Sequence, residues 1–75
     1  MMRVSEFWRA VDQVFGDAYG AVVSRDVVLE ELGGRSAAEA LDAGIDARRV
    51  WEALCESQDV PLEKRHGKGL AEPRD

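Results

Sequence analysis

Seventy-five residues leave room for one small hydrophobic core, which excludes a multi-domain enzyme. With 45% hydrophobic and 33% charged residues, the composition is typical of a globular protein and not of a disordered chain. The net charge of -5 is opposite to the basic charge of an autonomous nucleic-acid-binding protein, and therefore argues against tight non-specific DNA binding.

The charge is unevenly distributed along the chain. Residues 1–46 contain four basic and nine acidic side chains, whereas residues 47–75 contain six of each. An anionic partner would therefore have to contact the second half of the chain.

The sequence predicts no bound cofactor, no bound metal and no membrane-spanning segment. Apolar runs reach only three or four residues, too few to span a bilayer or to form a signal-peptide core. The single Cys55 cannot form an intramolecular disulfide, and with one His66 it supplies too few ligands for zinc. These observations predict a cytoplasmic chain without a bound metal or cofactor.

The pattern predicts an all-α fold, a compact bundle of four to five short helices, because strand-like alternation is absent. Ser5 is expected to cap a first helix that ends either at Gly16 or after Tyr19. Apolar residues recur in that segment at steps of three and four: Phe7, Trp8, Val11, Val14, Phe15 and Ala18.

A second helix is predicted from Arg25 to Leu32, with Ser24 as its N-cap and Gly33 and Gly34 as its end. Its buried residues would be Leu29, Leu32 and either Val27 or Val28.

Two further helices are predicted to form a helix-turn-helix-like unit over about residues 36–57. Ser36 and Glu39 are spaced as a capping box for a helix that ends at Gly44. Asp46 would cap the last helix, with Val50, Trp51, Leu54 and Cys55 on its buried side. A small residue, a glycine at the turn and a branched apolar residue beyond it are typical of two steeply crossed helices, including those of DNA-binding domains.

The candidate nucleic-acid-binding residues are all basic. Arg48 and Arg49 lie in the first turn of the last helix, where cations oppose the helix dipole. Alternatively, Arg48 pairs with Glu52, and Arg49 pairs with Asp46 or Asp42, as on an ordinary solvated face. Additional phosphate contacts could come from the C-terminal segment, through Lys64, Arg65 and Lys68. We assign residues 1–63 to a single helical domain and 64–75 to a flexible charged tail.

No residue pattern predicts catalysis, so an enzyme is not expected. His66 lacks a nucleophile and an orienting acid, and Cys55 lies on a buried helical stripe as an inert thiol. Trp8 and Trp51 occupy core-facing positions and are expected to pack against each other.

Several short motifs combine between Arg3 and Pro61, among them Val4-Ser5-Glu6-Phe7-Trp8, Phe15-Gly16-Asp17-Ala18-Tyr19, Glu31-Leu32-Gly33-Gly34-Arg35 and Ala53-Leu54-Cys55. In this combination the chain resembles a small actinobacterial family, domain of unknown function 3046. The resemblance implies a short, single-domain, cytoplasmic protein whose gene often lies beside those of the recombinase A protein and its regulator. It implies no activity and no catalytic residue.

Two functions remain open at this stage, both of a non-enzymatic binding module. In the first, which is slightly favoured, the last helix enters the major groove of DNA and serves regulation. In the second, an acidic face of the first two helices docks a basic protein, or an apolar groove accepts a helix, in an interaction or adaptor module that is linked to the recombinase A system.

Overall fold

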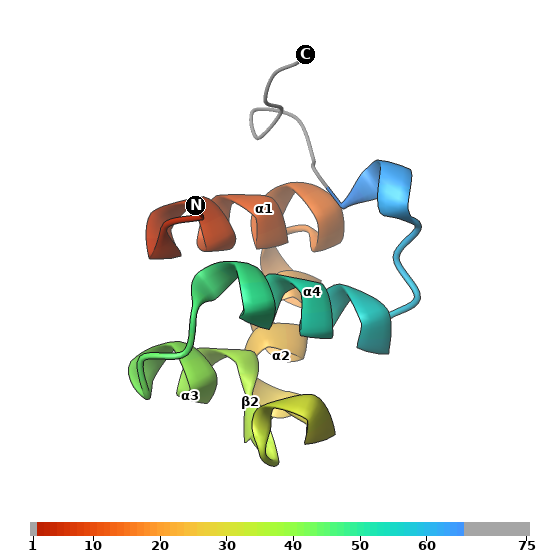
Figure 1. The fold of residues 1–75 in the computed structure, drawn as a ribbon. Helices are drawn as coiled ribbons and strands as arrows, with labels where there is room; N and C mark the ends of the chain where they lie inside the picture. The colour runs from red at the N-terminus through yellow and green to blue at the C-terminus, as the bar shows by residue number, and fades with distance from the viewer. Residues whose placement is uncertain (1, 66–75) are drawn as a thin grey trace.

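A computed structural model describes residues 2–65 as a small bundle of helices with a minimal hairpin. Its helices and strands are, in chain order, α1 (Val4–Phe15), α2 (Asp17–Asp26), β1 (Val28–Leu29), η1 (Glu30–Leu32), β2 (Arg35–Ser36), α3 (Ala37–Asp42), α4 (Ala47–Ser57) and η2 (Leu62–Lys64). Helices α1 and α4 lie next to each other, α2 passes behind them, and α3 lies below α4 (Figure 1). The prediction of a mostly helical bundle is confirmed.

Helix α1 begins two residues earlier than the sequence predicts. Its N-cap is Arg3, whose backbone N–H donates to Oε1 of Glu6 over 2.7 Å, so Ser5 lies inside the helix and does not cap it. The prediction for Ser5 is therefore wrong. The helix ends at Phe15, before Gly16, which adopts a φ of 87°. Of the two ends predicted for this helix, the earlier one is therefore correct.

The second helix was predicted in the wrong place, because Gly20 lies within α2 and does not end a helix. A Cβ at Gly20 would lie 2.7 Å from Cγ1 of Val11, so the glycine allows α1 and α2 to approach closely. Ser24 is likewise buried inside α2, where its hydroxyl donates to the carbonyl of Gly20 over 2.7 Å. Ala18, predicted to extend the apolar stripe, is exposed on α2.

Residues expected to form the end of that helix form a two-stranded hairpin instead. Strands β1 and β2 pair antiparallel, with Val28 opposite Ser36 and Leu29 opposite Arg35. The turn between them includes η1 and Gly33 in the left-handed conformation, with a φ of 75°. Leu29 is buried and Val28 exposed, which follows from the alternation of side chains along a strand.

The predicted starts of the last two helices are confirmed, and α3 ends at Asp42, two residues before the predicted Gly44. Ser36 Oγ accepts from the backbone N–H of Glu39 over 3.2 Å, and Glu39 Oε1 accepts from the N–H of Ser36 over 2.9 Å. Gly44 adopts a φ of 88°, and the N–H of Ile45 donates back to the carbonyl of Ala40 over 3.0 Å. The chain therefore bends between α3 and α4, and does not continue as one helix.

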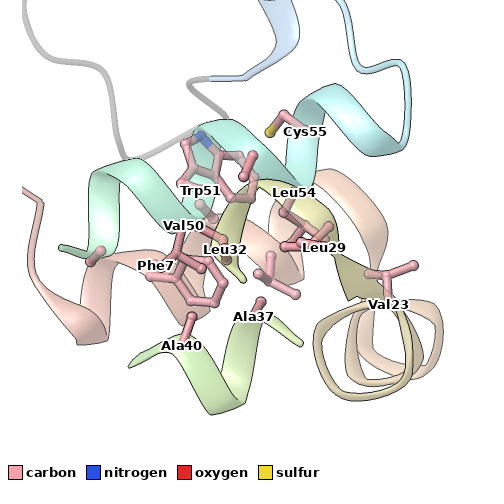
Figure 2. Packing of buried hydrophobic residues seen from close by; sticks show 14 of the residues in the cluster. Phe7, Val23, Leu29, Leu32, Ala37, Ala40, Val50, Trp51, Leu54 and Cys55 are labelled. Atoms are coloured by element: carbon pink, nitrogen blue, oxygen red, sulfur yellow. The ribbon is translucent and has the colours of Figure 1, made fainter. Parts of the chain in front are cut away.

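The core lies between all four α-helices and the hairpin, with Val23 of α2 and Ala37 and Ala40 of α3 among its buried residues (Figure 2). Phe7 is fully buried and meets Trp8 and Trp51 edge to face, with ring centroids 5.0 Å and 6.0 Å away. The two tryptophans were expected to pack against each other, but each of them contacts Phe7. This aromatic group joins α1 to α4.

Candidate functional site

The first turn of α4 presents Arg48 beside an acidic side chain. Nε of Arg48 lies 3.2 Å from Oε2 of Glu52, one turn further along, and both side chains are more than half exposed. The structure therefore agrees with the alternative in which Arg48 belongs to a solvated ion pair. Such exposed pairs contribute less than about 1 kcal/mol, so a strong anionic ligand could still compete for Arg48.

Arg49 is engaged differently from the sequence expectation. Nη2 of Arg49 lies 3.5 Å from the backbone carbonyl of Glu31 in η1, not beside the carboxylate of Asp46 or Asp42. Asp46 instead acts as the predicted N-cap, because its Oδ2 accepts from the backbone N–H of Arg49 over 3.4 Å. The expected guanidinium pairing of Arg49 is thus wrong.

A shallow groove of about 520 Å³ runs along α4 and holds both acidic and basic side chains. Its lining residues are Glu31, Leu32, Arg49, Glu52, Ala53, Glu56 and Arg65. Carboxylates from η1 and α4 therefore interleave with two of the arginines that were predicted to contact DNA. A phosphate backbone placed here would meet carboxylates as well as guanidinium groups.

The basic group at the C-terminal side is only partly within the described residues. Nε1 of Trp51 donates to the carbonyl of Arg65 over 2.8 Å, and Nε of Arg65 donates to the carbonyl of Val60 over 2.9 Å. Arg65 is thereby held against α4, although the sequence assigns it to the tail. Lys64 is exposed at the end of η2, while Lys68 and His66 lie outside the described residues.

Cys55 is buried on α4, as predicted (Figure 2). Desolvation by burial raises the pKa of its thiol from 9.0 to about 12, and this exceeds the opposing effect of the nearby Arg65. The thiolate required for nucleophilic or redox chemistry is therefore not formed near neutral pH.

An acidic pair at the junction of α1 and α2 was not identified from the sequence. The carboxyl groups of Asp12 and Asp17 are close enough to share a hydrogen bond, which, with their mutual repulsion, raises the pKa of Asp12. Within residues 2–65, the one ion pair is between Arg48 and Glu52, so neither aspartate has a cation within 4 Å; the nearest basic residue along α1 is Arg9, one turn before Asp12. The sequence contained one indication of this pair: an aspartate on either side of Gly16, the residue at which one helix ends and the next begins.

The position of a groove of about 470 Å³, at the other end of the α1–α2 pair, was not identified from the sequence. We call it the apolar groove after four of its lining residues, although Arg25 and Asp42 also line it. It is lined by Val4, Trp8, Arg25, Ala38, Leu41 and Asp42. These residues come from α1, α2 and α3, so the groove depends on a helix that the sequence placed elsewhere.

A family model described as a protein of unknown function, DUF3046, matches residues 2–63. The chain belongs to the DUF3046 family. No curated protein and no solved structure matches this chain.

In this DUF3046 chain, residues 2–65 contain no group of three or more His, Cys, Asp and Glu side chains arranged to hold a metal ion. Over the same residues, no helix is both long enough and apolar enough to traverse a bilayer.

Proposed function

We propose that this DUF3046 chain is a non-enzymatic interaction module that binds a basic protein partner through the acidic face of α1 and α2. The observation that carries the proposal is the Asp12–Asp17 pair, which is exposed and forms no ion pair within 4 Å among the described residues. A lysine or arginine of a partner would relieve the repulsion between these carboxylates.

The overall charge supports the same kind of partner. Residues 2–65 contain thirteen acidic and eight basic side chains, so the residues that the structure describes account for the whole net charge of -5. A field of this sign accelerates encounter with a basic protein and slows encounter with a polyanion.

DNA-associated regulation is the second candidate, and the bend at Gly44 favours it. The φ of 88° at this glycine separates α3 from α4, as the proposed docking of α4 in a major groove requires. Against it, Arg48 pairs with Glu52, and Arg49 shares its groove with three glutamates. These contacts make the protein partner the better supported proposal.

A capture experiment with the full chain as bait tests the proposal. We expect the wild type to retain a basic protein from cell extract at low salt and Asp12→Asn with Asp17→Asn to lose it. The matched control, Glu30→Gln with Glu63→Gln, changes the charge equally at two exposed positions outside the pair and should retain the partner. Retention that is equal in all three proteins would contradict the proposal.

Titration with duplex DNA at two salt concentrations tests the second candidate. We expect no binding even at low salt. Binding that weakens with salt, and that Arg48→Ala with Arg49→Ala reduces, would establish phosphate contacts by α4 and favour the DNA function instead.

A further inference from the structure

One flank of α1 joins the apolar groove to the acidic pair. Val4, Trp8 and Asp12 are spaced four residues apart and therefore follow one another along the same side of the helix. Val4 and Trp8 line the apolar groove, and Asp12 lies beside Asp17. Val4 is 50% exposed, and Trp8 is partly exposed, so this side of α1 is not covered by the rest of the fold.

The adjoining flank of α2 also joins the acidic pair to the apolar groove, but its chain runs from the pair to the groove. Asp17, Ala21 and Arg25 are also spaced four residues apart, and all three are exposed. Arg25 contributes to the apolar groove and Asp17 to the acidic pair, so the two flanks run side by side and antiparallel. We call these two flanks, from Val4 and Arg25 to Asp12 and Asp17, the α1–α2 seam.

The seam has the form of a helix-binding surface. Its middle carries the small side chain of Ala21, which allows another backbone to approach closely. One end offers the apolar groove, where Arg25 and Asp42 flank four apolar side chains. One of these is a tryptophan, a residue type that is enriched among the dominant contacts of protein interfaces. The other end offers two carboxylates that have no cation within 4 Å, so the ends of the seam differ in chemistry.

We infer that the α1–α2 seam binds one amphipathic helix of a partner protein, with an apolar side chain in the groove of Val4, Trp8, Ala38 and Leu41 and a lysine or arginine between Asp12 and Asp17. This inference rests on the proposed function and specifies its partner.

The spacing of the two partner residues follows from helix geometry. Eight residues separate Arg25 from Asp17, which corresponds to about 12 Å along α2 at 1.5 Å per residue. A partner helix that lies along the seam must therefore carry its apolar anchor and its cation about two turns apart. This is the helix-in-groove mode of recognition, in which residues on one face of the bound helix supply the contacts.

The test is a titration of the full, isotope-labelled chain with a synthetic helical peptide, followed by the NMR shifts of backbone amides. The peptide carries two leucines one turn apart and two lysines centred two turns beyond them on an alanine and glutamine background. We expect the largest shifts at Val4, Trp8, Ala21 and Asp17. Peptides in which the leucines become alanine, or the lysines become glutamine, should each bind at least about tenfold more weakly.

Two surface variants distinguish the seam from other exposed apolar positions. Val4 and Val22 are 50% and 49% exposed, but Val22 does not line the groove. Val4→Ser should weaken peptide binding roughly fivefold, and Val22→Ser should leave it within about twofold of wild type. Because both valines are half exposed, neither change is expected to unfold the chain.

The outcomes separate this inference from the proposed function. Shifts confined to Asp12 and Asp17, with no effect of Val4→Ser, would overturn the helix-binding seam while leaving a basic partner in place. An absence of shifts at both ends of the seam would also overturn it, and the capture experiment would then decide the proposed function separately.

Discussion

Two acidic groups in this fold have raised pKa values for different reasons. The Asp12 carboxyl is exposed, and its pKa is raised by a hydrogen bond and repulsion from Asp17, whereas the Cys55 thiol is buried, and its pKa is raised by desolvation. A ligand in solution can reach the first group and cannot reach the second. Only the carboxyl group of Asp12 is therefore suited to binding. The two groups also affect stability in different pH ranges, because a carboxyl and a thiol lose their protons at different pH.

Replacing Asp12 should stabilise the fold at neutral pH. Because the pKa of Asp12 is higher in the folded than in the unfolded state, stability falls as the pH rises through the raised value. Asp12→Asn should therefore raise the melting temperature at pH 7 and have little effect well below the ordinary pKa of 3.8. The exposed Glu63→Gln serves as control, and an equal gain for both variants would contradict the repulsion between the aspartates.

The thiol of Cys55 should become reactive only when the chain unfolds. Since burial raises its pKa from 9.0 to about 12, the unfolded chain loses this proton at lower pH than the folded one, and the free energy of unfolding decreases above pH 9. Urea unfolding at several pH values, compared with Cys55→Ala, isolates this contribution. Rapid labelling of the native thiol at pH 8 by a thiol reagent would show that the residue is accessible, contrary to this prediction.

At the level of helices and turns, the sequence predicts an element well when its start and end are set by nearby residues. The capping box of Ser36 and Glu39 and the cap at Asp46 have this local character, and both are present. Gly20 resembles a helix end in the sequence, but it is required by the approach of Val11 from another helix. That tertiary reason cannot be read from neighbouring residues, which is why α2 was predicted eight residues too late.

Removing the cap of α3 should destabilise the chain, whereas removing the hydroxyl at the wrongly predicted cap should not. Ser36→Ala loses the bond to the backbone N–H of Glu39, at a cost of about 1 kcal/mol. Ser5→Ala is the matched control, because Ser5 is exposed inside α1 and alanine favours helix. Chemical denaturation measures both values, and a larger loss for Ser5→Ala would show that it caps α1 after all.

The bend between α3 and α4 should depend on Gly44 through its backbone alone. Apart from Gly44 itself and its two chain neighbours, no residue has a heavy atom within 4 Å of the position that a Cβ would occupy, so a substitution is opposed only by the φ of 88°. Gly44→Val should destabilise the chain by more than about 1 kcal/mol, and Gly44→Asn by less, because asparagine tolerates this conformation. Thermal unfolding of the two variants checks the order, and an unchanged melting temperature for Gly44→Val would contradict the bend.

For the molecule as a whole, sequence reasoning located the exposed arginines of α4 but not the side chains around them. Arg48 and Arg49 are exposed as expected, yet Glu31, whose carbonyl Arg49 contacts, comes from η1, eighteen residues away. The apolar groove likewise requires α1, α2 and α3 to meet. Both surfaces arise from contacts between elements distant in sequence, and the misplaced second helix made such contacts impossible to infer.

The integrity of the whole bundle should depend strongly on Phe7, because its ring connects α1 with Trp51 of α4. Phe7 is fully buried, and Phe7→Ala should cost about 3 to 5 kcal/mol through lost burial and the cavity that remains. A chain of this size has a total stability of roughly 4 to 11 kcal/mol, so this variant should unfold at much lower urea concentration or be largely unfolded in water. Val22→Ala, at a half-exposed position, should leave the transition nearly unchanged. Circular dichroism during urea unfolding measures both, and a cost below about 1 kcal/mol for Phe7→Ala would show that the aromatic group does not hold α1 against α4.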